Sequence, residues 1–289
     1  MKKFFGLKII IAAAAVAISI SIFTLFLNDT AQANSVPLDV NVSSDAVSKA
    51  VIIDQLYDDV AHDWFHEDVS KLLAEAGYQV DIFTTKEVTL DFYKKLPLQN
   101  YKMVIVRSHG VADENENNQV ALFTGEKYTT DKYISEQLFG QVKKGAPLQE
   151  VDFDTTGTDA QWIIVNSTYR TLTTPAKTLT TSDEEYFLIT PNFIDTGMEG
   201  KFSNTLFVLG GCSTMNTDSM AKALVKRGAS TVVGWDRTVG SIENDMAMKL
   251  LLEKMLVDEM KVDDAVDSVM DEIPIEYMRY PSRLLTFSQ

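Results

Sequence analysis

Hydrophobic and polar positions along the chain predict strands and helices that follow one another in turn. Apolar runs typical of buried strands recur five times, at 49–56, 79–85, 101–110, 204–211 and 229–236. Apolar residues at helical spacing predict helices between and after them, at 62–78, 89–96, 218–228, 241–260 and 262–273. This alternation predicts an α/β fold, with a mostly parallel sheet covered by helices on both faces.

The stretch from 140 to 204 interrupts this pattern. It is rich in Thr, Asp and Gly, and its strand-like runs are short, at 161–167 and 185–191. We interpret it as an insertion at one end of the sheet, preceded by a short helix within 131–142. The segment 119–129 is expected to form a small hairpin that turns at Thr124-Gly125.

The N-terminus has the layout of a secretory signal. Three lysines precede an apolar run at 9–27, and an Ala-x-Ala pattern ends at Ala33. Residues 1–33 are therefore expected to be a signal peptide, followed by a polar linker at 34–48 and the main domain at 49–289. The alternative is an uncleaved membrane anchor, because the apolar run nearly reaches the length of a bilayer span. Either outcome predicts a secreted or extracytoplasmic protein.

Charge and cysteine usage narrow the function. The formal net charge of −15 argues against nucleic acid as a partner, because phosphates would be repelled. Cys212 is the only cysteine and cannot form a disulfide within the chain. An unpaired thiol outside the cytoplasm is exposed to oxidation unless it is buried or used.

Cys212 and His109 each lie at the end of a predicted strand. Ligands of parallel sheets bind at the carboxyl ends of the strands, so the two residues share one edge if their strands are neighbours. A cysteine thiolate forms more readily beside an imidazole, which can then protonate a leaving group. Taken singly, Cys212 could also be a small buried residue, and His109 a hydrogen-bonded residue at a strand end.

Glycines surround both residues. Gly110 follows His109, and its missing side chain would let a substrate carbonyl approach. The backbone N–H groups of Gly110 and Cys212 are candidate donors to a tetrahedral oxyanion. Gly210 and Gly211 are expected to let the chain bend and present the thiol.

Two patterns in the sequence could indicate a metal site, but both are weaker signals than the pair Cys212 and His109. His62 and His66 lie one helical turn apart and could form half of a zinc site. The oxygen-rich segment 113–118 lacks the spacing of a known calcium loop and is expected to be a solvated loop. We therefore expect no metal and no cofactor.

These segments also resemble the caspase-like cysteine peptidases of clan CD, which include caspases, metacaspases, gingipains, clostripain and the CHAT proteins. The histidine segment, MVIVRSHGVADENENNQVALFTGE, is similar to that of CHAT proteins. So is the cysteine segment, LFVLGGCSTMNTDSMAKALVKRGASTVVGWDRTVGSIENDMAMKLLLEKM. The resemblance extends over about residues 49–270 and is greatest to the CHAT, gingipain and clostripain group.

The resemblance implies a caspase-like three-layer α/β/α sandwich and a cysteine endopeptidase. Cys212 would be the nucleophile, and His109 the general base and acid, with no obligatory third member. Gly110 and Cys212 would supply the oxyanion hole. The substrate would be a protein or peptide, cut through a thioester acyl-enzyme.

Specificity is the least determined property. Some relatives that cut after Arg or Lys have an acidic residue two positions before the cysteine, where this chain has Gly210. Asp54 and Asp236 follow other predicted strands, and together with Trp235 they are the candidate substrate pocket, which favours basic residues before the scissile bond. Two alternatives remain: a non-catalytic caspase-like binding or scaffold protein, and a thiol-dependent acyl transferase.

Overall fold

The computed structural model describes residues 47–60, 62–113, 119–152, 162–165, 168–171 and 177–288. The expected signal peptide, almost all of the linker and most of the acidic loop at 113–118 lie outside these ranges. Within the ranges, no helix is both long enough and apolar enough to cross a membrane.

Six strands of the described chain form a central sheet in the order β14-β13-β12-β3-β1-β2. Five of them are parallel, and β14 runs antiparallel to β13 at one edge. The strands are β1 (Lys49–Asp54), β2 (Gln79–Thr84), β3 (Met103–Arg107), β12 (Thr205–Gly210), β13 (Ala229–Trp235) and β14 (Leu284–Ser288). The first five were predicted from their apolar runs, whereas β14 was not.

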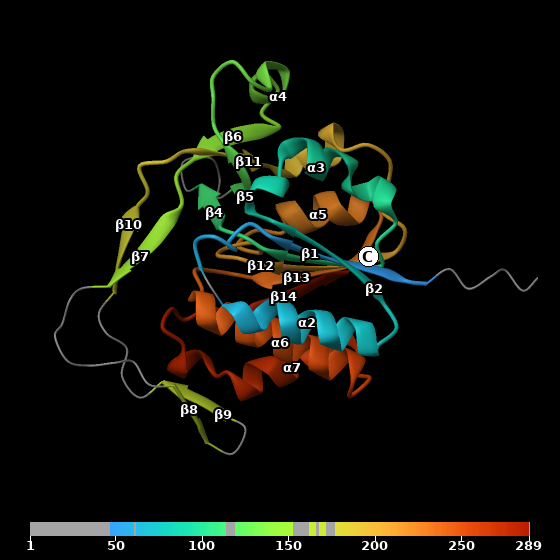
Figure 1. The fold of residues 1–289 in the computed structure, drawn as a ribbon, viewed down its shortest axis with the longest axis vertical. Helices are drawn as coiled ribbons and strands as arrows, with labels where there is room; N and C mark the ends of the chain where they lie inside the picture. The colour runs from blue at the N-terminus through green and yellow to red at the C-terminus, as the bar shows by residue number, and fades with distance from the viewer. Residues whose placement is uncertain are drawn as a thin grey trace, which may run out of the picture. The chain divides into compact units, whose positions relative to one another are not determined.

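Helices cover both faces of this sheet (Figure 1). One face carries α2 (Asp63–Glu75), α6 (Ser241–Leu256) and α7 (Val262–Glu272), and the other carries α3 (Leu90–Lys95) and α5 (Ser219–Lys226). Strand β1 shows why both faces need cover. Its alternate residues Val51 and Ile53 belong to one buried cluster, and Ala50 and Ile52 belong to the other. The expected α/β fold, with a mostly parallel sheet between two helical layers, is confirmed.

A second sheet continues from the end of β3. Its order is β4-β5-β11-β6, and all three of its pairings are antiparallel. Its strands are β4 (Gly110–Asp113), β5 (Gln119–Lys127), β6 (Val142–Gly145) and β11 (Tyr186–Ile189). The two ends of the predicted insertion therefore contribute strands to a sheet that begins beside His109.

The remaining elements are short. Two-stranded pairs are formed by β7 (Leu148–Asp152) with β10 (Lys177–Thr181), and by β8 (Trp162–Val165) with β9 (Thr168–Thr171). The helix expected within 131–142 is α4 (Ile134–Leu138). Single turns are η1 (Thr85–Glu87), η2 (Leu96–Gln99), η4 (Phe193–Gly197) and η5 (Ile275–Tyr277).

The hairpin predicted at Thr124-Gly125 was wrong, because β5 passes straight through these residues and pairs with β4. Gly125 is explained by a close approach. Its N–H donates to the Val88 carbonyl at 2.8 Å, and a Cβ built on it would lie 1.7 Å from the Thr85 carbonyl oxygen. The glycine thus makes room for the segment that follows β2.

Candidate active site

The register of β3 and β12 brings the two candidate catalytic residues to neighbouring strand ends. The strands are parallel, and Gly210 lies opposite Arg107. The pairing continues one residue further, because the N–H of Ser108 donates to the Gly210 carbonyl at 2.9 Å. His109 lies two residues after Arg107, and Cys212 lies two residues after Gly210, so both are at the carboxyl edge of the sheet.

Contacts between the two strand ends explain two of the glycines. A Cβ on Gly110 would lie 2.3 Å from the carbonyl oxygen of Cys212, and a Cβ on Gly211 would lie 2.2 Å from that of Ser108. Neither glycine has a positive φ. Residues 211–215 form the expected bend and turn. The close approach adds a steric reason for glycine at positions 110 and 211, because only glycine lets the segments approach so closely.

Gly210 has a different neighbour. A Cβ at this position would lie 2.0 Å from the Met248 sulfur and 2.9 Å from the Asn244 side-chain oxygen, both on α6. There is no room for the acidic side chain that some clan CD peptidases have two positions before the cysteine.

The segment that carries Cys212 is held against the end of β13. Ser213 donates its N–H to the Arg237 carbonyl and Met215 to the Trp235 carbonyl, each at 2.8 Å. Ser213 has a φ of 58°, in the left-handed region that non-glycine residues seldom adopt. The Cys212 thiol is partly buried and donates to the Val239 carbonyl at 3.5 Å. The cysteine is thus presented on a tightly bonded turn.

A hydrogen bond holds the backbone of His109, and an aromatic side chain packs beside its ring. Its backbone N–H donates to the Gln55 side-chain oxygen at 3.0 Å, and its ring stands edge-on to Phe123 with centroids 5.7 Å apart. Among the described residues, its buried Nε2 has no hydrogen-bond partner. The carboxylate of Asp59 lies 4.0 Å from Nε2, too far for a hydrogen bond.

Burial and charge keep the His109 imidazole neutral. Burial and, to a smaller extent, the nearby positive charge of Arg107 together lower the pKa of His109 from 6.5 to about 4. Burial also raises the pKa of the Asp59 carboxyl, and Asp58 and Glu184 add to this effect. At neutral pH, His109 is therefore unprotonated.

This pKa predicts how stability depends on pH. The unfolded chain protonates His109 below pH 6.5, whereas the folded chain resists protonation until about pH 4. The free energy of unfolding therefore decreases as pH falls from 6.5 to 4. His109 accounts for at most about 3 kcal/mol of this decrease. Urea unfolding of the wild type and of His109→Gln at several pH values would measure it. We expect the variant to lose less stability over this range, and equal losses would contradict the prediction.

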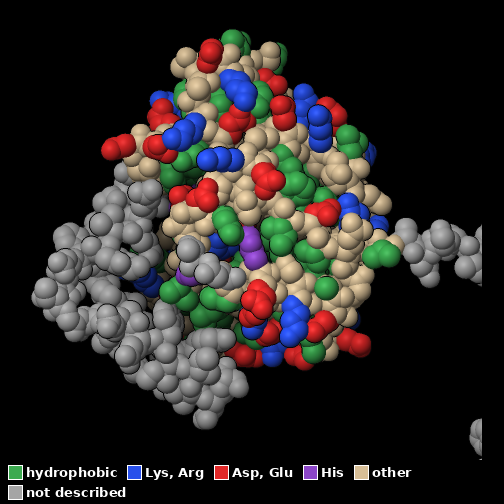
Figure 2. Space-filling model, viewed as in Figure 1, with side chains coloured by type: hydrophobic (Ala, Val, Ile, Leu, Met, Phe, Trp, Pro, Cys, Tyr) green, Lys and Arg blue, Asp and Glu red, His purple; other side chains and the backbone are tan. Residues whose placement is uncertain are grey.

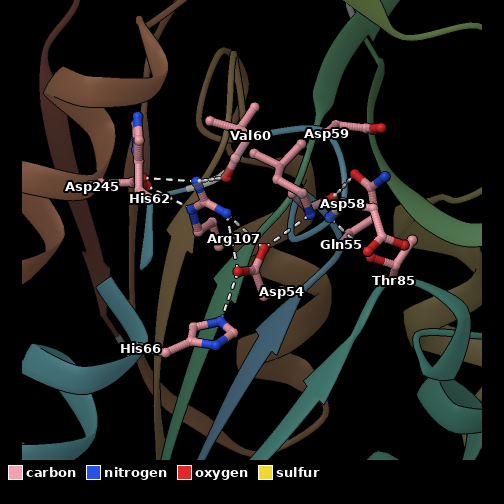
Figure 3. A network of polar contacts seen from close by, with 12 residues as sticks. Asp54, Gln55, Asp58, Asp59, Val60, His62, His66, Thr85, Arg107 and Asp245 are labelled. Carbon is pink, nitrogen blue, oxygen red and sulfur yellow. Dashed lines mark hydrogen bonds and ion pairs between the residues drawn. The ribbon is translucent and has the colours of Figure 1, made fainter. Parts of the chain in front are cut away.

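Beside His109 lies a buried ionic cluster that the sequence analysis did not identify, which we call the Arg107 cluster (Figure 3). Arg107 donates to Asp54 at 2.9 and 3.0 Å, and to Asp245 at 2.8 and 2.9 Å. His66 contacts Asp54 at 2.7 Å, and His62 contacts Asp245 at 2.5 Å. Arg107, Asp54 and Asp245 are at most 1 % exposed.

In the Arg107 cluster, the carboxylates of Asp54 and Asp245 stabilise the positive charge of Arg107. Burial acts to lower the pKa of Arg107, but Asp245 and Asp54 outweigh it, so the pKa is raised above its usual value. The guanidinium also donates to the Val60 carbonyl at 3.0 Å. The cluster thus fixes the segment after β1, which carries the Gln55 side chain that bonds His109.

Two of the three predicted pocket residues have structural roles instead. The Asp54 carboxylate is taken up by Arg107 and His66, so it cannot serve as a free acid for a substrate cation. Trp235 is fully buried, and its indole N–H donates to the Asn244 side-chain oxygen at 3.0 Å. We correct the prediction for both residues.

Asp236 remains near the surface at the end of β13. Its carboxylate accepts from the Ser282 hydroxyl at 3.0 Å and from the Arg283 N–H at 2.7 Å. These bonds tie the strand end to the segment that precedes β14.

The two histidines at the start of α2 contact separate carboxylates: His62, the residue before the helix, contacts Asp245, and His66 contacts Asp54. In the described parts of the chain, no group of three or more His, Cys, Asp or Glu side chains could hold a metal ion. Histidine side chains are visible at the surface of the view in Figure 2, beside hydrophobic and acidic ones.

No protein-family model and no curated protein sequence matches this chain. The fold and the site geometry are therefore what support a functional class.

Proposed function

We propose that this protein is a caspase-like cysteine endopeptidase that uses Cys212 and His109 to hydrolyse peptide bonds. The observation that carries the proposal is the shared strand register, which brings Cys212 and His109 to adjacent ends of β12 and β3. The layered parallel sheet with both residues at its carboxyl edge is the arrangement that the clan CD resemblance implies.

The chemistry follows from the two side chains. His109 takes the thiol proton of Cys212, and the sulfur attacks the peptide carbonyl carbon. The C–N bond breaks as the imidazolium returns the proton to the leaving amine, and a thioester remains on the enzyme. A water molecule, deprotonated by His109, then attacks the thioester, which releases the carboxylic acid and the thiol.

The register also supports the proposed oxyanion hole. The Phe123 N–H donates to the His109 carbonyl at 3.1 Å, so this carbonyl points towards β5. The N–H of Gly110 belongs to the same planar trans peptide unit and points the opposite way, away from β5. It is therefore directed to the side of β3 where Cys212 follows β12, as an oxyanion donor requires.

A preference for basic residues before the scissile bond is not part of the proposal. Its support depended on Asp54, whose carboxylate is bound to Arg107, and on Asp236, which bonds Ser282 and Arg283.

The second candidate is a non-catalytic member of the same class, a binding or scaffold protein. It is favoured by the contacts of Cys212, whose thiol bonds the Val239 carbonyl and which packs against one buried cluster. Such contacts also suit a cysteine that only fills space.

Thiol reactivity separates the two candidates. At neutral pH, iodoacetamide should modify Cys212 faster than free cysteine, because His109 assists thiolate formation. The site of modification is unambiguous, since the chain has one cysteine, and intact-mass measurement gives the rate. His109→Gln should slow the reaction. If Cys212 reacts no faster than free cysteine and His109→Gln has no effect, the enzyme proposal fails. Rapid labelling without peptide hydrolysis would instead point to an acyl transferase.

A further inference from the structure

One face of the second sheet begins at the candidate catalytic histidine. Directly opposite residues of an antiparallel pair lie on the same face. The β4–β5 register sets Val111 opposite Ala121 and, two pairs earlier, His109 opposite Phe123. The β5–β11 register adds Leu188 opposite Phe123. These five side chains therefore share one face, and the ring contact between His109 and Phe123 agrees with this.

This face carries an apolar cluster, together with Gln119 and Lys143, although the opposite face already packs on the core. Val120, Leu122, Phe187 and Ile189 fill the larger buried cluster on the core side. An antiparallel sheet with one face on the core usually presents polar residues on the other. Here that other face carries a separate apolar cluster, centred on Ala121, Phe123 and Leu188. Core packing of the sheet does not account for it.

A cavity of about 360 Å³ lies over this face. Its lining includes Val111, Ala121, Phe123 and Leu188, with Lys143 and Lys144 contributed by β6. Lys144 forms an ion pair with Glu185 at 2.9 Å, so its charge is balanced. The volume lies at the lower end of the range for small-ligand pockets, about 300–1,000 Å³. It suits one large apolar side chain.

The chemistry of the dyad determines which part of a peptide would reach this cavity. The sulfur of Cys212 holds the acyl half, whereas His109 protonates the nitrogen of the leaving half. The residue after the scissile bond therefore lies on the His109 side, away from β12. On that side the chain continues into β4, where Val111 and Phe123 line the cavity.

We propose that this cavity is the subsite for a bulky apolar residue immediately after the scissile bond. The inference rests on the proposed peptidase function and names its substrate class: peptides in which leucine, phenylalanine or a similar side chain begins the leaving half. The cavity contacts the leaving group through the same aromatic ring, Phe123, that stands against His109.

A peptide library randomised on both sides of the cleavage point tests the inference. Mass spectrometry of the products identifies the residue that begins each released fragment. We expect phenylalanine or leucine there, and kcat/KM about 10- to 100-fold above that of the matched glycine peptide. Iodoacetamide labelling of Cys212 runs in parallel, because that reagent does not depend on a peptide leaving half.

Cavity-filling variants complete the test. Val111→Trp and, independently, Gly145→Leu should each lower the preference, so that kcat/KM for the phenylalanine peptide approaches kcat/KM for the glycine peptide. The rate of Cys212 labelling should stay unchanged. A Cβ on Gly145 would already lie 3.1 Å from Leu188 and 3.3 Å from Phe123, so a leucine there enters the cavity. Val257→Trp, at a position 64 % exposed after α6, is the matched control and should keep the preference.

The outcomes separate the two proposals. Cleavage without an apolar preference, a preference for acidic residues, or a preference that survives both filling variants would overturn the subsite and leave the peptidase function standing. No cleavage together with slow labelling of Cys212 would overturn the peptidase function itself.

Discussion

Replacing Arg107 with methionine is expected to lower the free energy of unfolding by about 3–5 kcal/mol, because two buried carboxylates would lose their shared cation. Asp54 and Asp245 are at most 1 % exposed and each receives two bonds from the guanidinium. A domain of ordinary stability has about 5–15 kcal/mol in total, so the variant should unfold at a much lower urea concentration. Urea titration followed by circular dichroism measures the difference.

Lys226→Met is the matched control for this variant. Lys226 pairs with Asp195 at 2.7 Å, but its side chain is 69 % exposed. Loss of such a surface pair should cost less than about 1 kcal/mol. If Arg107→Met destabilises the protein no more than Lys226→Met, the Arg107 cluster does not stabilise the fold as described.

Cys212→Ala is expected to reduce peptide hydrolysis to a low residual rate, and His109→Gln to reduce kcat/KM by about 100- to 10,000-fold. The alanine variant has no nucleophile, and the glutamine variant loses the general base and acid, whose contribution is of that order. The measurement is the hydrolysis rate of the peptide that the library identifies as the best substrate, with thermal unfolding of each variant as a check on folding.

The double variant Cys212→Ala/His109→Gln sharpens this prediction. Residues that act as one unit have non-additive effects, so the double variant should be no slower than Cys212→Ala alone. Rates that fall further, by the product of the two single effects, would contradict joint action of the two side chains.

The sheet and the position of both residues at strand ends could be predicted from local patterns. The pairing of β3 with β12 could not, because strand order depends on contacts between segments about 100 residues apart. Apolar runs marked the strands, and the carboxyl-edge rule placed the residues that follow them. The turn at Thr124-Gly125 could not be predicted correctly. A glycine in a strand that allows a close approach leaves the same local signal as a glycine in a turn.

The Arg107 cluster was missed for a related reason. Arg107 ends an apolar strand, and Asp245 lies in a helix whose neighbouring residues are also buried. A lone charge within a buried run is a usable signal, because charged side chains are seldom fully buried unless they are paired. Its partners could not be identified from the sequence, since 53 residues separate Arg107 from Asp54 and 138 separate it from Asp245.

The separation between Arg107 and Asp245 has a consequence for the order of assembly. During synthesis, Arg107 and His109 leave the ribosome well before α6, so the cation has only Asp54 available until residue 245 emerges. The support of the histidine is complete only when the C-terminal helices have docked. Cys212 precedes residue 245, so the segment that carries the thiol is made before the support of His109 is complete. Assembly of the candidate site is thereby linked to synthesis of α6.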